Sequence, residues 1–226
     1  MNESKPDKLL LWLDLESTGL DTSAGDEIIE IGCILTTDYL RTLGEFAAVV
    51  KPSDTALSRL FDDQFLVDMH TANGLLDEID GGRSITWVEH DLLAWLDSFG
   101  TSEPDTNRRR IKASGYDTDH VLDVVIPASP KFTLACSGVG HFDLPTVREH
   151  MPRLAGRLNY FVLDVGVIRR AHEMWVSTPV SAANDAKTHR ALDDVRCHLD
   201  EARAFQDLWR DTQLGSLWRE TQVERD

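Results

Sequence analysis

The stretch Leu11-Trp12-Leu13-Asp14-Leu15-Glu16-Ser17-Thr18-Gly19-Leu20-Asp21 decides the fold of this chain. It continues an apolar run over residues 8–15, which predicts a strand buried on both faces. Asp14 and Glu16 end this strand two residues apart, so their carboxylates lie on one face. Such a pair is costly to bury without a positive partner, and a divalent cation is a suitable one. Two solvated acids at a strand end are the simpler alternative.

The segments that follow predict a mixed α/β domain. Apolar, β-branched runs at 28–35 and 43–50 have short connections, which predicts an antiparallel meander with the first strand. This order of elements indicates one sheet flanked by helices. Further strands are expected at 132–136 and 161–165, and helices at 53–79 (broken, with a stop at Gly74), 86–99 (with a Thr86–Glu89 capping box), 143–151, 166–175 and 189–209.

The length of 226 residues suits a single domain spanning 1–226 with two additions. Residues 101–131 are polar and uneven, which predicts an irregular insertion. Residues 206–226 predict a C-terminal helical extension that packs on the body or on a second subunit.

The chain is strongly acidic, with 23 Lys and Arg against 39 Asp and Glu and a formal net charge of −16. This charge excludes a protein that coats nucleic acid through a broadly positive surface, and it argues against an anionic membrane partner. Metal-dependent chemistry on nucleic acid stays open. The three cysteines are widely separated, so neither a disulfide framework nor a zinc site is indicated. With no signal-peptide core and no membrane-spanning run, we expect a cytoplasmic protein.

Two further segments carry acids in suggestive positions. In residues 189–194 (HRALDD), a helix entered near His189 places Asp194 about one turn inside it, on the same face as His198. Favourable interaction with the helix dipole is the structural alternative. In residues 141–145 (HFDLP), Asp143 follows a strand and a glycine-flanked turn, where it is either a site residue or the N-cap of the next helix.

Together the three segments resemble the motifs of the DEDDh 3′→5′ exonucleases, most closely the oligoribonuclease branch. Residues 11–21, 151–154, 163–165 and 188–196 match in the right order, and the resemblance is weakest over 102–131. It implies a ribonuclease-H-like mixed sheet of three antiparallel strands and then parallel strands, flanked by α-helices. The family's four acids fall on Asp14, Glu16, Asp143 and Asp194 (Asp193 if the register slips), its histidine falls on His189, and Asp164 is read as structural.

The resemblance implies a metal-dependent exoribonuclease that degrades short RNA oligonucleotides from their 3′ ends to nucleoside 5′-monophosphates. Two divalent cations, Mg²⁺ or Mn²⁺, would be held by the four acids, with Asp14 bridging them. His189 would take the proton from the attacking water. A proofreading-type 3′→5′ DNA exonuclease with the same acids is an alternative, and so is a catalytically silent nucleic-acid-binding module.

Positions that contact substrate in the family also have counterparts. Leu20 matches a residue that wedges between the last two bases, and Phe65 replaces an aromatic residue, usually Trp, that stacks on a base. His70 matches a histidine near the phosphate, and Tyr160 a tyrosine that the partner subunit contributes in these homodimers. Ordinary core packing is the alternative for Leu20 and Phe65.

Three departures bear on substrate length. Val139 and Gly166 replace serines, and Phe161 replaces an arginine, in the group that closes the family's site around the 5′ phosphate of a dinucleotide. We therefore expect activity on oligomers well beyond two nucleotides. The basic residues of 108–112 either steer longer substrates or belong to a solvated loop.

Overall fold

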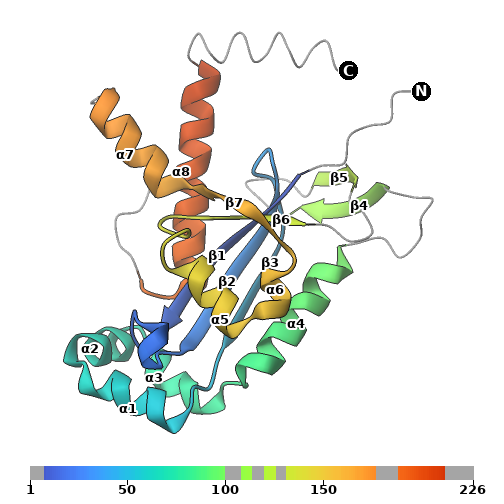
Figure 1. The fold of residues 1–226 in the computed structure, drawn as a ribbon. Helices are drawn as coiled ribbons and strands as arrows, with labels where there is room; N and C mark the ends of the chain where they lie inside the picture. The colour runs from blue at the N-terminus through green and yellow to red at the C-terminus, as the bar shows by residue number, and fades with distance from the viewer. Residues whose placement is uncertain (1–7, 100–107, 114–119, 126–130, 177–187, 212–226) are drawn as a thin grey trace.

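The computed structural model describes residues 8–99, 108–113, 120–125, 131–176 and 188–211 (Figure 1). Its strands are β1 (Leu9–Ser17), β2 (Ile28–Thr37), β3 (Thr42–Val49), β4 (Arg108–Ala113), β5 (His120–Val125), β6 (Phe132–Cys136) and β7 (Leu158–Asp164). Its helices are α1 (Asp54–Asp62), α2 (Gln64–Ala72), α3 (Leu75–Glu78), α4 (Ile85–Ser98), α5 (Asp143–His150), α6 (Pro152–Ala155), α7 (Val165–Trp175) and α8 (Ala191–Asp211), with short 3₁₀ turns at Thr22–Ala24 and Ile79–Gly81.

Five strands form one mixed sheet in the order β3-β2-β1-β6-β7. The strands β1, β2 and β3 are antiparallel neighbours, whereas β6 pairs in parallel with β1 and β7 in parallel with β6. The predicted sheet of three antiparallel strands followed by parallel ones is therefore confirmed. In the central strand β1 every residue except Asp14 is buried, as the continuous apolar run predicted.

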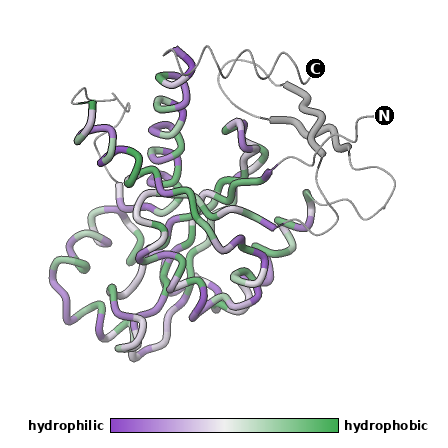
Figure 2. Tube along the Cα trace, turned by 45° about the horizontal axis from the view of Figure 1, so that its top comes forward, coloured by the Kyte–Doolittle hydropathy of each residue, from purple (hydrophilic) through white to green (hydrophobic). Residues whose placement is uncertain are grey.

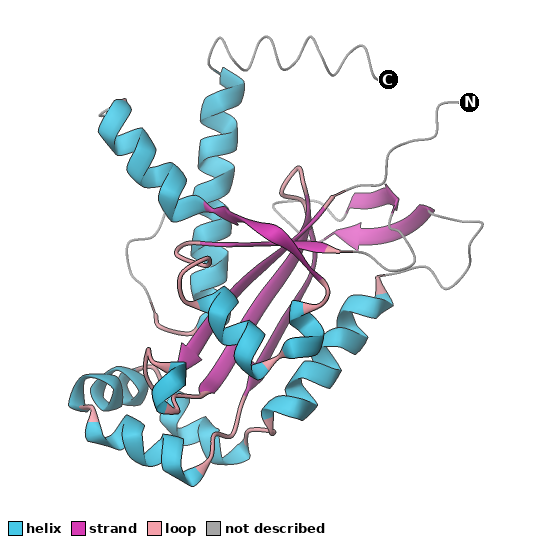
Figure 3. Ribbon diagram, in the orientation of Figure 1, coloured by secondary structure: helices cyan, strands magenta, loops and turns pink. Residues whose placement is uncertain are grey.

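Helices cover both faces of the sheet. The long helix α8 lies on one face against β1 and β2, and α4, α5 and α6 lie on the other (Figure 3). Helices α1, α2 and α3 gather beyond the end of β1 (Figure 1). Apolar residues follow the central strands (Figure 2), and the Trp12 indole, which is fully buried there, donates a 3.0 Å hydrogen bond to Thr36 Oγ1. The end of β1 lies between α8 and the group formed by α1, α2 and α3, and the candidate site opens there.

Two local predictions were wrong. The segment 101–131 contains an antiparallel hairpin, β4 and β5, where an irregular loop was expected. The predicted capping box is absent, because α4 follows Ser84 and has no side-chain cap. The carboxylate of Glu89 instead accepts hydrogen bonds from the backbone N–H groups of Arg153 and Leu154, at the start of α6. Glu89 thus makes a long-range contact with α6, whereas the local sequence pattern predicted that it caps its own helix.

Other boundaries agree with the sequence. The helical segment 53–79 is broken as predicted, and Gly74 adopts a φ of 79° after α2. Helix α8 extends to Asp211, and the rest of the predicted C-terminal extension, like the expected loop at 177–187, lies outside the described residues. Among the helices that the structure describes, none has the length and apolar character needed to cross a membrane.

Candidate functional site

Three predicted site residues meet at the end of β1. Potential ligand atoms of Glu16, His189 and Asp194 all lie within 4.8 Å of one another. Glu16 comes from β1, His189 from the segment before α8, and Asp194 from the first turn of α8. Asp194 is buried, whereas Asp193 is half exposed and pairs with Arg196 at 2.9 Å. The structure therefore brings Asp194, and not its neighbour, to the other two residues.

A glycine allows α8 to begin so close to the sheet. Gly32 on β2 lies opposite Asp14 in the β1–β2 register. A Cβ atom at Gly32 would lie 2.3 Å from the backbone nitrogen of Leu192 and 2.4 Å from the carbonyl carbon of Ala191. The first turn of α8 thus packs directly on the β2 backbone, and this contact sets the position of Asp194 relative to β1.

An arginine holds the segment that carries His189. Arg190 donates to Glu30 Oε1 from Nε at 3.0 Å and from Nη2 at 2.8 Å. It also donates to both carboxylate oxygens of Glu78, at 3.1 and 2.8 Å, and the free oxygen of Glu30 accepts from Ala191 N at 2.9 Å. Hydrogen bonds to Glu78 and Glu30 raise the pKa of Arg190, and its hydrogen bond lowers the pKa of Glu78. Glu30 is buried, so this pairing compensates its charge.

The backbone of His189 is held as well. The Asn73 side-chain amide donates to the His189 carbonyl, and Arg190 Nη1 donates to the Asn73 carbonyl at 3.3 Å. His189 has a φ of 52°, in the left-handed region that a non-glycine residue adopts only when its surroundings hold it there. Four residues that support the site were not predicted from the sequence: Glu30, Asn73, Glu78 and Arg190. Glu30 could have indicated this contact, because an acid inside the apolar run of β2 requires a buried partner.

His70 is buried beside these groups. Neither of its ring nitrogens makes a hydrogen bond within the part of the chain that the structure describes, and Nε2 lies 4.0 Å from Glu16 Oε2. Burial lowers the pKa of His70 to about 4, and the charges of His189 and Arg190 act in the same direction. The imidazole is therefore neutral at pH 7 and offers one N–H donor to a ligand oxygen.

A cleft of about 740 Å³ is lined by the predicted site residues that meet at the end of β1. Two apolar side chains also line it and are largely exposed, Leu20 at 83% and Phe65 at 71%. The core-packing alternative for both residues is therefore wrong. The predicted positions that line the cleft are Asp14, Glu16, Leu20, Phe65, His70, His189 and Asp194.

Asp143 and Tyr160 do not line this cleft. Asp143 is buried as the first residue of α5, next to the cleft residue Phe142. It is not the N-cap, because Phe142 holds that position and no side chain caps the helix. Burial raises the pKa of the Cys33 thiol, and the charges of Asp14 and Asp143 raise it further. Tyr160 is 90% exposed on β7, an edge strand of the sheet.

Four further positions lie outside the catalytic set: Asp164, Gly166, Val139 and Phe161. Asp164 is structural, as predicted, because its carboxylate accepts from Gly138 N and Val167 N at 3.1 Å. A Cβ at Gly166 would lie 2.4 Å from Ser137 Oγ, so the adjacent serine fills the space that a side chain here would need. Val139 is fully buried and Phe161 is exposed.

The donor set fits a divalent cation. Carboxylate oxygens suit hard cations, and imidazole is a further ligand for transition metals. With metal–oxygen distances of about 2.1 Å, ligand atoms on opposite sides of one ion lie about 4.2 Å apart. The ligand atoms of Glu16, His189 and Asp194 lie within 4.8 Å of one another, which is close to this spacing.

Comparisons with known proteins agree with this geometry. An exonuclease family model matches residues 11–60. The oligoribonuclease of Leifsonia xyli subsp. xyli is 30% identical over 188 residues, which span 82% of this chain and 76% of the relative. That of Streptomyces griseus is 29% identical over 204 residues, which span 88% and 85%.

Solved structures share the fold. A product-bound exonuclease I has a TM-score of 0.59 at 13% identity, covering 88% of this chain and 43% of that one. The nuclease domain of 3′hExo, described as a DEDDh family member bound to rAMP, has a TM-score of 0.50 at 17% identity and covers 89% and 93%. The similarity to these curated relatives extends over most of the chain. The chain therefore belongs to the oligoribonuclease family of DEDDh 3′→5′ exonucleases.

Proposed function

We propose that this exonuclease degrades RNA oligonucleotides to nucleoside 5′-monophosphates in the cytoplasm, with two Mg²⁺ or Mn²⁺ ions held by the four matched acids. The observation that carries this proposal is the meeting of Glu16, His189 and Asp194 in a cleft that Asp14 also lines. Asp143, buried next to the cleft residue Phe142, is proposed as the acid that would help to hold the second cation. Three cysteines without disulfide bonds suit a reducing compartment.

The chain's own residues have separable tasks in hydrolysis. Bound divalent cations neutralise charge on the phosphoryl oxygens and lower the pKa of a water molecule. Glu16 presents its carboxylate from β1 and Asp194 from α8, whose first turn packs on β2 at Gly32. His189 accepts the proton of the attacking water at a ring nitrogen, and the Asn73 and Arg190 contacts keep it in place. Neutral His70 donates a hydrogen bond to a phosphate oxygen.

Substrate recognition relies on exposed apolar side chains. Leu20 and Phe65 line the cleft with most of their surface open to solvent, which suits wedging between bases and stacking on them. Buried Val139 has no hydroxyl to offer a terminal phosphate, and Gly166 has no room for one. The site is therefore proposed to accept oligomers well beyond two nucleotides.

A homodimer is part of this proposal. Tyr160 and Phe161 are exposed on the edge strand β7, with ring centroids 5.7 Å apart. The neighbouring helix α7 exposes Met174 and Trp175. We propose that these exposed apolar side chains contact the partner subunit, so that Tyr160 reaches the partner's cleft.

One time course tests the activity. Labelled RNA oligomers of two to about twenty nucleotides, and DNA oligomers of the same sequences, are incubated with Mg²⁺, Mn²⁺ or a chelator. We expect stepwise 3′ shortening of RNA at every length with either metal, and none with the chelator. Degradation of the dinucleotide alone would contradict the proposed length range, faster cleavage of DNA would favour the proofreading alternative, and no turnover with either metal would leave the silent binding module.

The stacking role of Phe65 predicts a selective loss of affinity. Removing one base–aromatic contact costs roughly 1–3 kcal/mol, so Phe65→Ala is expected to raise KM for a short RNA by about 5–160-fold. Phe61→Ala is the matched control, because Phe61 on α1 is also exposed but does not line the cleft. Steady-state kinetics with an RNA pentamer measure both. Equal KM values for the two variants would remove Phe65 from the substrate site.

A further inference from the structure

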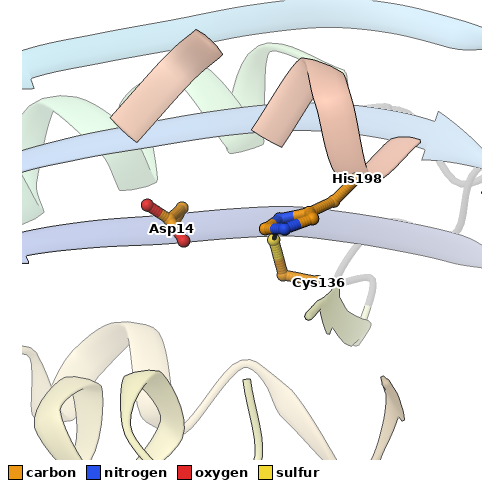
Figure 4. A group of neighbouring side chains, drawn as sticks. All are labelled: Asp14, Cys136 and His198. Carbon is orange, nitrogen blue, oxygen red and sulfur yellow. Dashed lines mark hydrogen bonds between the residues drawn. The ribbon is translucent and has the colours of Figure 1, made fainter. Parts of the chain in front are cut away.

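A second cluster of metal-ligating side chains lies behind the acids of the cleft. It consists of Asp14 on β1, Cys136 at the end of β6 and His198 on α8 (Figure 4). One ligand atom from each lies within 4.8 Å of the others, and Cys136 Sγ lies 3.0 Å from His198 Nδ1. Three elements far apart in the sequence thus bring together a thiol, an imidazole and a carboxylate.

This donor set differs from that of the cleft. Thiolate and imidazole ligands favour Zn²⁺, whereas Mg²⁺ selects oxygen ligands. Tetrahedral Zn²⁺ with bonds of about 2.0–2.3 Å places its ligand atoms roughly 3.3–3.8 Å apart. The three side chains are already close to this spacing, since their ligand atoms lie within 4.8 Å.

The burial of the cluster gives it one open side. Cys136 is fully buried and His198 is 4% exposed, whereas Asp14 is partly exposed and lines the cleft. A cation therefore has a route from the cleft past Asp14, and a water molecule from the same side can take the fourth coordination position.

We propose that Asp14, Cys136 and His198 form a Zn²⁺ site whose occupation inhibits the nuclease. Binding forms a Zn–S bond and releases the Cys136 thiol proton to solvent, while His198 and the Asp14 carboxylate supply the other protein ligands. The inhibition follows because Zn²⁺ would hold a carboxylate oxygen of Asp14 on the side of Cys136 and His198 and so withdraw it from the proposed catalytic cations. That consequence rests on the proposed function, whereas the binding site itself does not.

Spectroscopy of the metal-free full-length protein tests the site without any nuclease assay. Co²⁺ replaces Zn²⁺ as a probe, and a bound thiolate gives an intense thiolate-to-cobalt charge-transfer band in the near ultraviolet. We expect this band in the wild type and in Cys197→Ser, which alters the partly buried cysteine next to His198. We expect its loss in Cys136→Ser. A wild-type spectrum without the band, or a band that survives in Cys136→Ser, overturns the proposal.

The His198→Gln variant distinguishes the loss of a metal ligand from misfolding. This variant keeps Cys136 but removes the imidazole, so Co²⁺ affinity should fall on the order of 100-fold while the band stays visible at high Co²⁺. Thermal unfolding monitored by circular dichroism identifies which variants are folded. An unchanged Co²⁺ affinity in folded His198→Gln would also contradict the site.

Inhibition is measured separately, at fixed Mg²⁺ with increasing buffered Zn²⁺. The Zn²⁺ concentration for half inhibition should rise on the order of 100-fold in Cys136→Ser and remain unchanged in Cys197→Ser. Equal values in all three proteins would overturn the inhibitory role. A wild type that binds Co²⁺ through thiolate but has no nuclease activity would support the site and contradict the proposed function.

Discussion

Asp194→Asn is expected to lower kcat on an RNA oligomer by about 1000-fold, whereas Asp193→Asn should change it by no more than about twofold. A catalytic cation supplies several kcal/mol of transition-state stabilisation, and each 1.36 kcal/mol is about tenfold in rate. Asp194 is buried and its ligand atoms lie within 4.8 Å of those of Glu16 and His189, so removing its charge weakens cation binding directly. Asp193 is half exposed and pairs with Arg196, a surface contact that contributes less than about 1 kcal/mol.

The adjacent pair provides its own control. Both substitutions replace a carboxylate by an amide in the first turn of α8, so any effect on the helix dipole is shared. Single-turnover rates at saturating Mg²⁺, with unfolding midpoints as a check on folding, separate chemistry from stability. An equal loss of rate in the two variants would mean that both acids act only through the charge at the start of the helix. A greater loss of rate in Asp193→Asn would mean that the family's acid falls on Asp193.

Gly32→Ala is expected to lower both stability and activity although Gly32 contains no functional group. The new Cβ would lie 2.3 Å from Leu192 N, and backbone on both sides cannot yield as a flexible side chain can. Overpacking of this kind costs about 1–3 kcal/mol in the free energy of unfolding. Relief requires the start of α8 to move from β2 and carry Asp194 with it, and a displacement of about 1 Å can reduce the rate on the order of 100-fold.

Gly81→Ala is the matched control for this prediction. Apart from Gly81 and its two chain neighbours, no atom of the described residues lies within 4 Å of a Cβ built at Gly81. The unfolding free energy of Gly81→Ala should therefore stay within about 0.5 kcal/mol of that of the wild type. Urea unfolding curves and kcat are measured for both variants. If Gly32→Ala matched Gly81→Ala in both quantities, the close approach of α8 to β2 would not be what positions Asp194.

The fold was predictable because its signals are local. An apolar run of strand length, such as that of β1, or a helical spacing of apolar residues reports burial directly. The capping box of Thr86 and Glu89 failed for the opposite reason. Glu89 had a local partner in the sequence pattern, but two backbone N–H groups of α6 bind it in the folded chain. The hairpin of β4 and β5 was missed because the basic run of β4 (RRRIKA) and the polar residues around both strands resemble a loop, although β5 (HVLDVV) has the apolar, β-branched composition of a strand.

In the candidate site, too, local motifs were visible in the sequence and long-range contacts were not. The motifs identified Asp14, Glu16, Asp194 and His189, since their spacing along one strand and one helix start is visible in the sequence. The supporting contacts were not visible, because Arg190 meets Glu30 and Glu78 across 160 and 112 residues of chain. The same holds for Cys136 and His198, which are 62 residues apart and meet in the core.

The sequence by itself determined the type of fold, the family and three acids that line the cleft, Asp14, Glu16 and Asp194. Periodicity and motif spacing act over a few residues and need no knowledge of long-range packing. Only the tertiary structure decided which carboxylates meet, what holds His189, and that a cysteine and a histidine lie beside Asp14. Those choices depend on how α8 packs on β2 at Gly32, because that contact sets distances between residues that the chain itself does not connect.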